Sequence, residues 1–324
     1  MYYFAADGGG NKLTAIVYDD EFNIVSRDVG GATNPLYRTQ ESISAELERM
    51  SAKLLDGVGE IESADICISG DVSAFDAALN KYAQIKRFRH NDSGAVMMAA
   101  ACGKTNGIVT YSGTGSVSYL LEPGIHDAIG GWGDILGDEG SGSYIGMKAL
   151  NAAIWSYDGR GMKTSLEQII KREWRLHHMY ELTSRVYTDV DRRRRLASAA
   201  LLCAEAARAG DTVAVNIYTH AAHHLAHLTN TLLDRRNGLG RNNIVVSGGA
   251  WKGPDLMFDT FCEDIRKKYP DAVISRPAFE PVIGNVILRL LYEGRRKSDF
   301  WDAVTSKFAD YLYTKERENA NDQG

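Results

Sequence analysis

The sequence predicts an α/β protein with two related domains, and three observations support this fold class. The chain has 324 residues, which is more than one hydrophobic core normally supports. Apolar, β-prone runs alternate with amphipathic stretches at helical spacing. One pattern also occurs twice, from Phe4 and again from Ile108: strand, glycine turn, strand, polar turn, strand, Gly-Gly. Such a duplication predicts two domains that each present a glycine turn to a shared cleft.

Composition narrows the class of protein. Hydrophobic residues make up 44% of the chain and charged residues 24%, as in ordinary soluble globular proteins. The net charge of −5 argues against a general nucleic-acid or acidic-membrane binder. No signal peptide is recognisable, and no stretch approaches the roughly 20 apolar residues of a transmembrane helix. We therefore expect a cytoplasmic protein. The cysteines form no CxxC pair, so we expect buried apolar residues and neither a zinc site nor a disulfide framework; they are Cys67, Cys102, Cys203 and Cys262.

The first copy of the pattern predicts a hairpin around a bare glycine turn. A strand at residues 2–6 is followed by the turn at 7–12 and a strand at 14–18, and a third strand at 24–29 ends at Gly-Gly. A P-loop or a dinucleotide-binding fold would need a helix directly after the glycines. Backbone N–H groups of such turns form an anion-binding concavity, so phosphate is the first expected ligand.

The rest of the first domain leads to a candidate acid. Helical spacing predicts helices over residues 42–55 and 75–79, and apolar runs predict strands at 65–69 and 85–88. Asp92 then lies between the last strand and a helix predicted over 94–101. An acid at the carboxyl end of a strand is a candidate for chemistry, but Asp is also a favoured helix N-cap. Its position alone leaves both interpretations open.

The second copy, within residues 107–146, carries the densest glycine pattern. An apolar run at 108–111 stops at a Ser-Gly-Thr-Gly turn and resumes as an alternating run at 117–121, which predicts a second hairpin. The loop that follows places Asp134, Asp138 and Glu139 among glycines before a helix predicted over 144–155. Acids in a tight loop suggest recognition of hydroxyls or a metal. Two ordinary glycine turns in a β-rich region are the alternative.

The remainder is mostly helical. From about residue 163 to 236 we expect helices, in which the basic run 191–195 forms a solvated face and Asp211 caps the helix after Gly210. Histidines at helical spacing are expected to pack or face solvent and not to bind metal, because no acid lies among them; they are His220, His223, His224 and His227. A buried strand at 243–247 then leads to a third glycine turn, a helix over 255–268, a strand at 272–275 and an apolar helix over 286–292.

Together the motifs resemble a known family. DGGGNK, ND, YSGTGS, GGWGDILGDEGSGSYIG, AARAGD and SGGAW come in the order and approximate spacing of the N-acetylglucosamine kinase and BadF/BadG-type ATPase family, part of the sugar kinase, Hsp70 and actin superfamily. The resemblance spans nearly the whole chain. It implies two ribonuclease-H-like (actin-like ATPase) domains around an interdomain ATP cleft. The first is expected to comprise residues 1–106, joined by a C-terminal helix over 295–324, and the second, with a helical insertion, residues 107–294.

The resemblance also implies a role for each motif. Asp92 aligns with the catalytic base, and Asp7 with a position near Mg²⁺. The glycine turns align with residues that contact ATP, namely Gly8, Gly9, Gly10, Asn11, Lys12, Ser112, Gly113, Thr114 and Gly115 at the phosphates and Gly248 and Gly249 at the adenosine. The sugar is expected at Asn34, Thr114, Gly131, Trp132 and Asp138.

These roles predict an ATP- and Mg²⁺-dependent amino-sugar kinase. The expected acceptor is the 6-hydroxyl of N-acetylglucosamine or glucosamine, and we expect a homodimer without nucleic-acid or membrane partners. Asn11 replaces a threonine of many family members, and Val117 stands near an asparagine of some kinases, so contacts to phosphate and to the N-acetyl group are left open. The alternatives are an N-acetylmuramic acid kinase, a BadF-type ATPase that activates a partner enzyme, and a sensor without catalysis.

Overall fold

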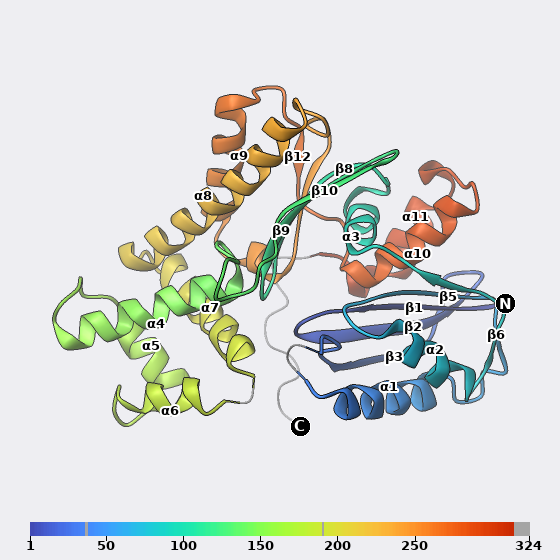
Figure 1. The fold of residues 1–324 in the computed structure, drawn as a ribbon, viewed down its shortest axis with the longest axis horizontal. Helices are drawn as coiled ribbons and strands as arrows, with labels where there is room; N and C mark the ends of the chain where they lie inside the picture. The colour runs from blue at the N-terminus through green and yellow to red at the C-terminus, as the bar shows by residue number, and fades with distance from the viewer. Residues whose placement is uncertain (36–37, 190, 314–324) are drawn as a thin grey trace. The chain divides into compact units, whose positions relative to one another are not determined.

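The computed structural model describes residues 1–35, 38–189 and 191–313, and this part of the chain forms two compact units. Unit 1 consists of Met1–Asn106 and Arg276–Tyr313, and the described part of unit 2 is Gly107–Ser275. Each unit contains a five-stranded sheet with its own covering helices (Figure 1). None of the helices in these ranges is long and apolar enough to cross a membrane.

The sheet of unit 1 has the strand order β3-β2-β1-β5-β7. β1, β2 and β3 are antiparallel, whereas β5 and β7 run parallel to β1. The carboxyl ends of β1, β5 and β7 therefore lie at one edge, where open α/β sheets bind ligands. The strands are β1 (Tyr2–Gly8), β2 (Lys12–Asp19), β3 (Ile24–Gly31), β5 (Ser63–Ile68) and β7 (Phe88–His90), and a separate pair is β4 (Glu60–Ile61) with β6 (Gln84–Ile85).

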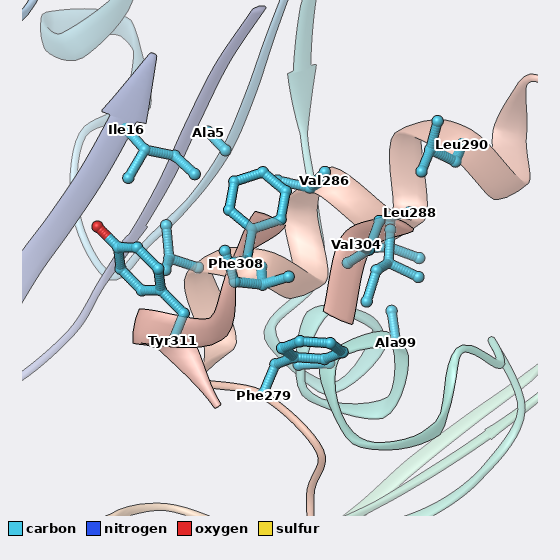
Figure 2. Close-up of a cluster of buried hydrophobic side chains, with 14 of the residues drawn as sticks. Ala5, Ile16, Ala99, Phe279, Val286, Leu288, Leu290, Val304, Phe308 and Tyr311 are labelled. Atoms are coloured by element: carbon cyan, nitrogen blue, oxygen red, sulfur yellow. The ribbon is translucent and has the colours of Figure 1, made fainter. Parts of the chain in front are cut away.

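Both faces of this sheet are covered, because successive side chains of a strand point to opposite sides. Phe4 packs in a core with α1 and α2, whereas its neighbour Ala5 packs with α3, α10 and the C-terminal segment. Figure 2 shows Ala5 and Ile16 near Phe308 and Val286 in this second core. The helices of unit 1 are α1 (Gln40–Leu54), α2 (Val72–Asn80), α3 (Ser93–Cys102), α10 (Pro281–Tyr292) and α11 (Trp301–Lys307), with 3₁₀ turns η2 (Lys297–Asp299) and η3 (Ala309–Tyr311).

Helix α10 lies in unit 1, although we expected the second domain to continue to residue 294. Val286 on α10 is fully buried against the side of the sheet that carries Ala5. The apolar face of this helix is needed to cover that sheet, so the chain returns to unit 1 at Arg276 and not at residue 295. The part of the expected C-terminal helix beyond residue 313 lies outside the described residues.

The sheet of unit 2 repeats the topology of the first. Its order is β10-β9-β8-β11-β12. When only the strands of each five-stranded sheet are numbered along the chain, both sheets have the order 3-2-1-4-5. β8, β9 and β10 are antiparallel, and β11 and β12 run parallel to β8. The common order confirms the duplication predicted from the sequence. The strands are β8 (Gly107–Ser112), β9 (Ser116–Glu122), β10 (Ile125–Gly130), β11 (Ile244–Ser247) and β12 (Ile274–Ser275).

The helices of unit 2 include the insertion between its third and fourth strands. α4 and α7 pack closely, because Gly146 lies against the carbonyl oxygen of Leu196, where any side chain would overlap. Asp211 caps α8 as expected, accepting hydrogen bonds from the N–H groups of Val213 and Ala214. The helices are α4 (Gly142–Asp158), α5 (Leu166–Glu173), α6 (Glu181–Tyr187), α7 (Arg192–Arg208), α8 (Thr212–Arg235), η1 (Gly249–Lys252) and α9 (Asp255–Lys268).

Candidate active site

In unit 1, the first glycine turn is anchored at both ends by backbone hydrogen bonds. The N–H of Gly9 donates to the carbonyl of Lys12 at 3.1 Å, and the carbonyl of Gly9 accepts from the N–H of Thr33 at 3.0 Å. The carbonyl of Gly8 accepts from Ser69, which follows β5. A Cβ added to Gly9 would meet only the Ser69 hydroxyl, at 3.9 Å. The turn is therefore rigid and has open space beside the Gly9 backbone, as an anion cradle requires.

Asp7 precedes this turn at the end of β1. Burial raises its pKa to about 7; the positive charge of Lys12 and a hydrogen bond with Cys67 act against this shift, and the negative charge of Glu280 adds to it. A bound cation would offset the cost of holding this carboxylate ionised. Among the described residues there is no group of three metal-ligating side chains, so a cation here would need water or ligand oxygens, as Mg²⁺ commonly does.

Asp92 has both features that its position suggested. It is the N-cap of α3, and its Oδ1 accepts a hydrogen bond from the N–H of Ala95 at 3.1 Å. The side chain is nevertheless exposed, and no described residue hydrogen-bonds its Oδ2. One oxygen therefore caps the helix while the other remains accessible. The cap does not exclude a role in chemistry.

Asp7 and Asp92 lie in one neighbourhood, with Cys67 on β5 between them. Burial raises the pKa of the Cys67 thiol well above its usual value, and the negative charges of Asp7 and Asp92 both add to this shift. The three residues belong to β1, β5 and the turn after β7, whose carboxyl ends meet at the same edge. Asn34 is partly buried, after Thr33, whose buried Oγ1 has no hydrogen-bond partner in the described structure.

In unit 2, the second glycine turn is joined to the loop that carries Asp138. The hydroxyl of Ser112 donates to the carbonyl of Gly140 at 2.8 Å, and the N–H of Gly142 donates to the carbonyl of Gly113 at 2.7 Å. Three further bonds connect the same segments: Ser143 to the Thr114 carbonyl, Ser116 to the Glu139 carbonyl, and the Ser116 N–H to Oδ1 of Asp138 at 3.2 Å. Two motifs separated in sequence thus form one surface.

Asp138 is the centre of this surface. It is only 3% exposed and has a left-handed backbone, with a φ of 60°, which is uncommon for a residue other than glycine. Its Oδ2 accepts a hydrogen bond from Arg193 on α7. The expectation that the whole basic run 191–195 faces solvent is therefore wrong for Arg193, because the buried carboxylate of Asp138 needs a positive partner.

Several positions in this region require glycine for packing reasons that the motif alone does not reveal. A Cβ on Gly113 would overlap the Tyr111 phenol, so here glycine makes room for a side chain. Gly248 has a φ of 103°, and its Cβ would overlap the carbonyl of Ser112. The third turn therefore packs directly on the second, and the Trp251 indole N–H fixes it further by donating to the Thr110 carbonyl at 3.2 Å. A Cβ on Gly249 would meet open space.

The loop before Asp138 is exposed and apolar. Gly131 has a φ of 78° and donates its N–H to the Ser116 carbonyl at 2.9 Å, whereas Trp132 is 74% exposed. A cavity of about 530 Å³ borders Asp138 between α4, α6 and the start of α7. Its lining includes Asp134, Tyr144, Tyr187 and Arg192. Ligand pockets are commonly of this size and mostly apolar with a few polar groups.

The histidines of α8, Asp211 and the cysteines are the other residues that the sequence singled out. Nδ1 of His223 pairs with Asp264, and Nε2 of His224 lies 3.2 Å from the Tyr144 hydroxyl. Both oxygens of Asp211 are engaged, one by the α8 cap and one by Thr164 and Ser165. Cys67, Cys203 and Cys262 are buried free thiols, and Cys102 is partly buried.

Three residues that contact or surround the candidate site residues belong to no motif recognised in the sequence. Arg193 belonged to a run expected to be solvated, Asn285 comes directly before the helix predicted over 286–292, and Glu280 directly precedes Pro281. In the structure the side-chain amide of Asn285 donates to the carbonyl of Ala6, beside Asp7. For Asn285 the sequence does contain a signal, because a polar side chain beside an apolar run needs a hydrogen-bond partner if that run is buried. The other two contacts depend on packing between distant segments.

The fold and the site define a class of protein. Two units of the same topology each carry a glycine turn between antiparallel strands, one beside a partly buried carboxyl and the other beside a buried one. The third glycine turn lies against the second. These features are typical of ATP-using enzymes of the actin-like fold, in which backbone donors hold phosphate.

Comparisons with known proteins identify the family. Residues 6–288 match the model of the BadF/BadG/BcrA/BcrD ATPase family, and the chain belongs to this family. An N-acetylmuramic acid/N-acetylglucosamine kinase of Clostridium acetobutylicum is 26% identical over 301 residues, which cover 89% of this chain and 97% of that protein. An N-acetyl-D-glucosamine kinase of Dictyostelium discoideum is 26% identical over 315 residues, with the same coverage of 89% and 97%.

A solved structure supports the fold. A protein of Chromobacterium violaceum, assigned as an N-acetylglucosamine kinase, superimposes with a TM-score of 0.65 at 22% identity, covering 89% of this chain and 98% of that one. At this identity the likeness concerns the fold alone. It confirms the predicted two-domain, actin-like ATPase architecture.

Proposed function

We propose that the protein is an ATP-dependent kinase that phosphorylates an amino sugar, N-acetylglucosamine or glucosamine, at the 6-hydroxyl. The observation that carries this proposal is the hydrogen bond from the Ser116 N–H to Asp138. It joins the second glycine turn, which is suited to binding phosphate, to a buried carboxylate. The names of the two curated relatives, both kinases of N-acetylated amino sugars, support the same class of substrate.

The sugar is bound by side chains that differ in hydrogen-bonding capacity. The Asp138 carboxylate only accepts hydrogen bonds when ionised, whereas the Asn34 amide both donates and accepts, so the two side chains select different hydroxyl directions. Thr114, Gly131 and Trp132 complete the proposed sugar contacts. Support for Thr114 and Gly131 comes from their hydrogen bonds, to Ser143 and Ser116, within the same surface as Asp138.

ATP is bound mainly by backbone. The family assignment supports ATP as the phosphoryl donor. We assign the phosphates to the turn Gly8, Gly9, Gly10, Asn11 and Lys12 and to the turn Ser112, Gly113, Thr114 and Gly115, and the adenosine to Gly248 and Gly249. The open space beside Gly9 and Gly249 supports these assignments, because a ligand can approach their main chain.

Asp7 is the proposed residue for Mg²⁺. Its raised pKa reflects a carboxylate that a cation would stabilise, which supports the assignment. When bound, Mg²⁺ would neutralise negative charge on the phosphates. Asp7 would hold the cation through its carboxylate and, as the last residue before Gly8 on β1, is joined directly to the glycine turn.

Asp92 is the proposed general base. Its exposed Oδ2 accepts the proton of the acceptor hydroxyl while that oxygen forms its bond to the γ-phosphorus, and ADP leaves with the electrons of the broken bond. The helix cap holds Oδ1 in place, so the carboxylate does not have to be ordered when the sugar binds. This arrangement supports the assignment of Asp92 as the general base, because its carboxylate is already held in position to accept the proton of the hydroxyl.

A rate assay tests the function. ADP release is measured with N-acetylglucosamine, glucosamine, N-acetylmuramic acid, glucose and no sugar. We expect turnover that depends on at least one of the three amino sugars, with clearly lower efficiency on glucose. Full ATP turnover without sugar would indicate an activator-type ATPase, and no turnover with ATP bound would indicate a sensor. A homodimer is part of the proposal, and light scattering in solution tests it separately.

A further inference from the structure

The inference concerns Arg193, the second residue of α7. Its side chain is 12% exposed, whereas the neighbouring Arg194 is exposed. Nη2 of Arg193 donates to Oδ2 of Asp138, and its Nε lies 4.0 Å from Oδ1 of Asp134. Arg192 also reaches this loop, with Nη2 3.7 Å from Oδ2 of Asp134. The start of α7 thus faces two of the three acids in the loop before α4, Asp134 and Asp138.

Two groups hold the carboxylate of Asp138 from different directions. Oδ1 accepts from the backbone N–H of Ser116, and Oδ2 accepts from Arg193. An ionised carboxylate offers about four acceptor positions, so these bonds fix the orientation of the carboxylate and leave positions free for hydroxyls. A buried carboxylate without its cation would be costly. The orientation of Asp138 therefore depends on a side chain from a different helix.

The ion pair also contacts the second glycine turn. A Cβ on Gly115 would overlap Nη2 of Arg193 and would lie 2.7 Å from Oδ2 of Asp138. The φ of Gly115 is not in the left-handed region, so the backbone conformation alone does not require glycine. Glycine at this position makes room for the ion pair. Arg193 therefore packs on the same turn that is proposed to bind phosphate.

We propose that Arg193 is a positioning residue for the acceptor sugar, which orients the Asp138 carboxylate toward the sugar hydroxyls. The inference rests on the proposed function, because it takes Asp138 as a sugar ligand. Without the guanidinium, the carboxylate can rotate about its side-chain bonds and no longer presents fixed acceptors. ATP binding depends instead on the backbone N–H groups of the turns, whereas the guanidinium of Arg193 donates to the carboxylate of Asp138. The effect of losing Arg193 should therefore fall on the sugar.

A double-mutant cycle with Arg193→Gln and Asp138→Asn tests this. kcat/KM for the sugar is measured from linear rates below saturation, and KM for ATP at saturating sugar. We expect Arg193→Gln to lower kcat/KM for the sugar about 10- to 100-fold, mainly through a higher KM. KM for ATP should stay within about threefold. Arg194→Gln, on the same helix turn but exposed, is the matched control and should behave like the wild type.

The cycle separates positioning from a general structural role. In the Asp138→Asn background, Arg193→Gln should change kcat/KM for the sugar by less than about threefold, because the charged carboxylate that Arg193 orients is gone. An equal loss in both backgrounds, or a loss confined to ATP, would overturn the inference. If Arg193→Gln does not fold, Arg193→Lys replaces it, since an ammonium keeps the charge without the planar fork, and the same criteria apply. Failure of the proposed function is distinguishable, because the wild type would then show no sugar-dependent turnover at all.

Discussion

The buried Asn285 and the partly buried Asn91 form an amide pair that connects the surroundings of the two proposed catalytic-site carboxylates, Asp7 and Asp92. The side-chain amide of Asn91 donates to the side-chain oxygen of Asn285 at 2.8 Å, and the amide of Asn285 donates to the carbonyl of Ala6 at 2.8 Å. Asn91 precedes Asp92 and Ala6 precedes Asp7. Helix α10 thereby holds the Ala6 backbone beside Asp7 and the Asn91 side chain beside Asp92, which explains why a polar side chain is buried in this apolar helix.

Replacing this link should impair turnover more than binding. Asn285→Leu leaves the Ala6 carbonyl and the Asn91 amide without their partner, so we expect about 1–3 kcal/mol lower stability. We also expect about a tenfold or larger loss of kcat, because small displacements of a base are costly. Steady-state kinetics and thermal unfolding measure both. Asn230→Leu, which removes a partly buried Asn on α8, should keep kcat, and equal losses in the two variants would contradict the link.

Asp92 can be tested without losing its helix cap. Asn and Ser are both good N-caps, so Asp92→Asn and Asp92→Ser should keep the fold and the affinities for sugar and ATP. Turnover should fall by about 10² to 10⁴ in both, because neither side chain accepts the proton. Binding is measured by calorimetry and turnover by ADP release. Near-normal turnover in either variant would show that Asp92 acts only as a cap.

Gly9→Ala tests the first glycine turn with little risk to folding. The added Cβ would meet only the Ser69 hydroxyl, at 3.9 Å, and the φ of Gly9 is not in the left-handed region. The melting temperature should therefore stay near that of the wild type, while KM for ATP rises about tenfold or more, because the methyl group occupies the space assigned to phosphate. Gly59→Ala, also in open space, is the control. An unchanged KM for ATP would remove the turn from the phosphate site.

Gly113→Ala is a poorer test of the second turn than the motif suggests. Its Cβ would first displace the Tyr111 phenol, so a loss of ATP binding would not report on phosphate contact alone. Gly9 gives the cleaner result.

The raised pKa of Asp7 predicts how stability depends on pH. Burial raises the pKa of Asp7 in the folded protein to about 7, whereas an aspartate in the unfolded chain has an ordinary pKa of about 4. The contribution of Asp7 to stability therefore falls as the pH rises from about 4 to 7 and then levels off. In EDTA and without ATP, Asp7→Asn should therefore be more stable than the wild type, and the difference should be larger at pH 8.5 than at pH 5. Thermal unfolding at both pH values measures it. A difference independent of pH would contradict the perturbed pKa.

The local pattern of the sequence predicted the strand–glycine–strand units and their duplication, because side-chain alternation and glycine turns are local features. The return of α10 to unit 1 was not predicted, since Val286 would suit the core of either unit. The contact between Arg193 and Asp138 was also missed, because a basic run at a helix start usually faces solvent. The assignment of Gly115 and Gly248 to ATP stays a prediction. The structure shows another need for glycine at these positions, an ion pair beside Gly115 and the Ser112 carbonyl beside Gly248, and both depend on residues distant in sequence.

The most direct test of the central claim is the destination of the γ-phosphoryl group. ATP labelled with ³²P at the γ-position is incubated with the protein, Mg²⁺ and N-acetylglucosamine or glucosamine, and the labelled products are separated and counted. An amino-sugar kinase should place one labelled phosphate on the sugar for each ADP formed and should release almost no labelled inorganic phosphate. ADP formation accompanied by inorganic phosphate alone, at a rate that neither sugar changes, would contradict the assignment.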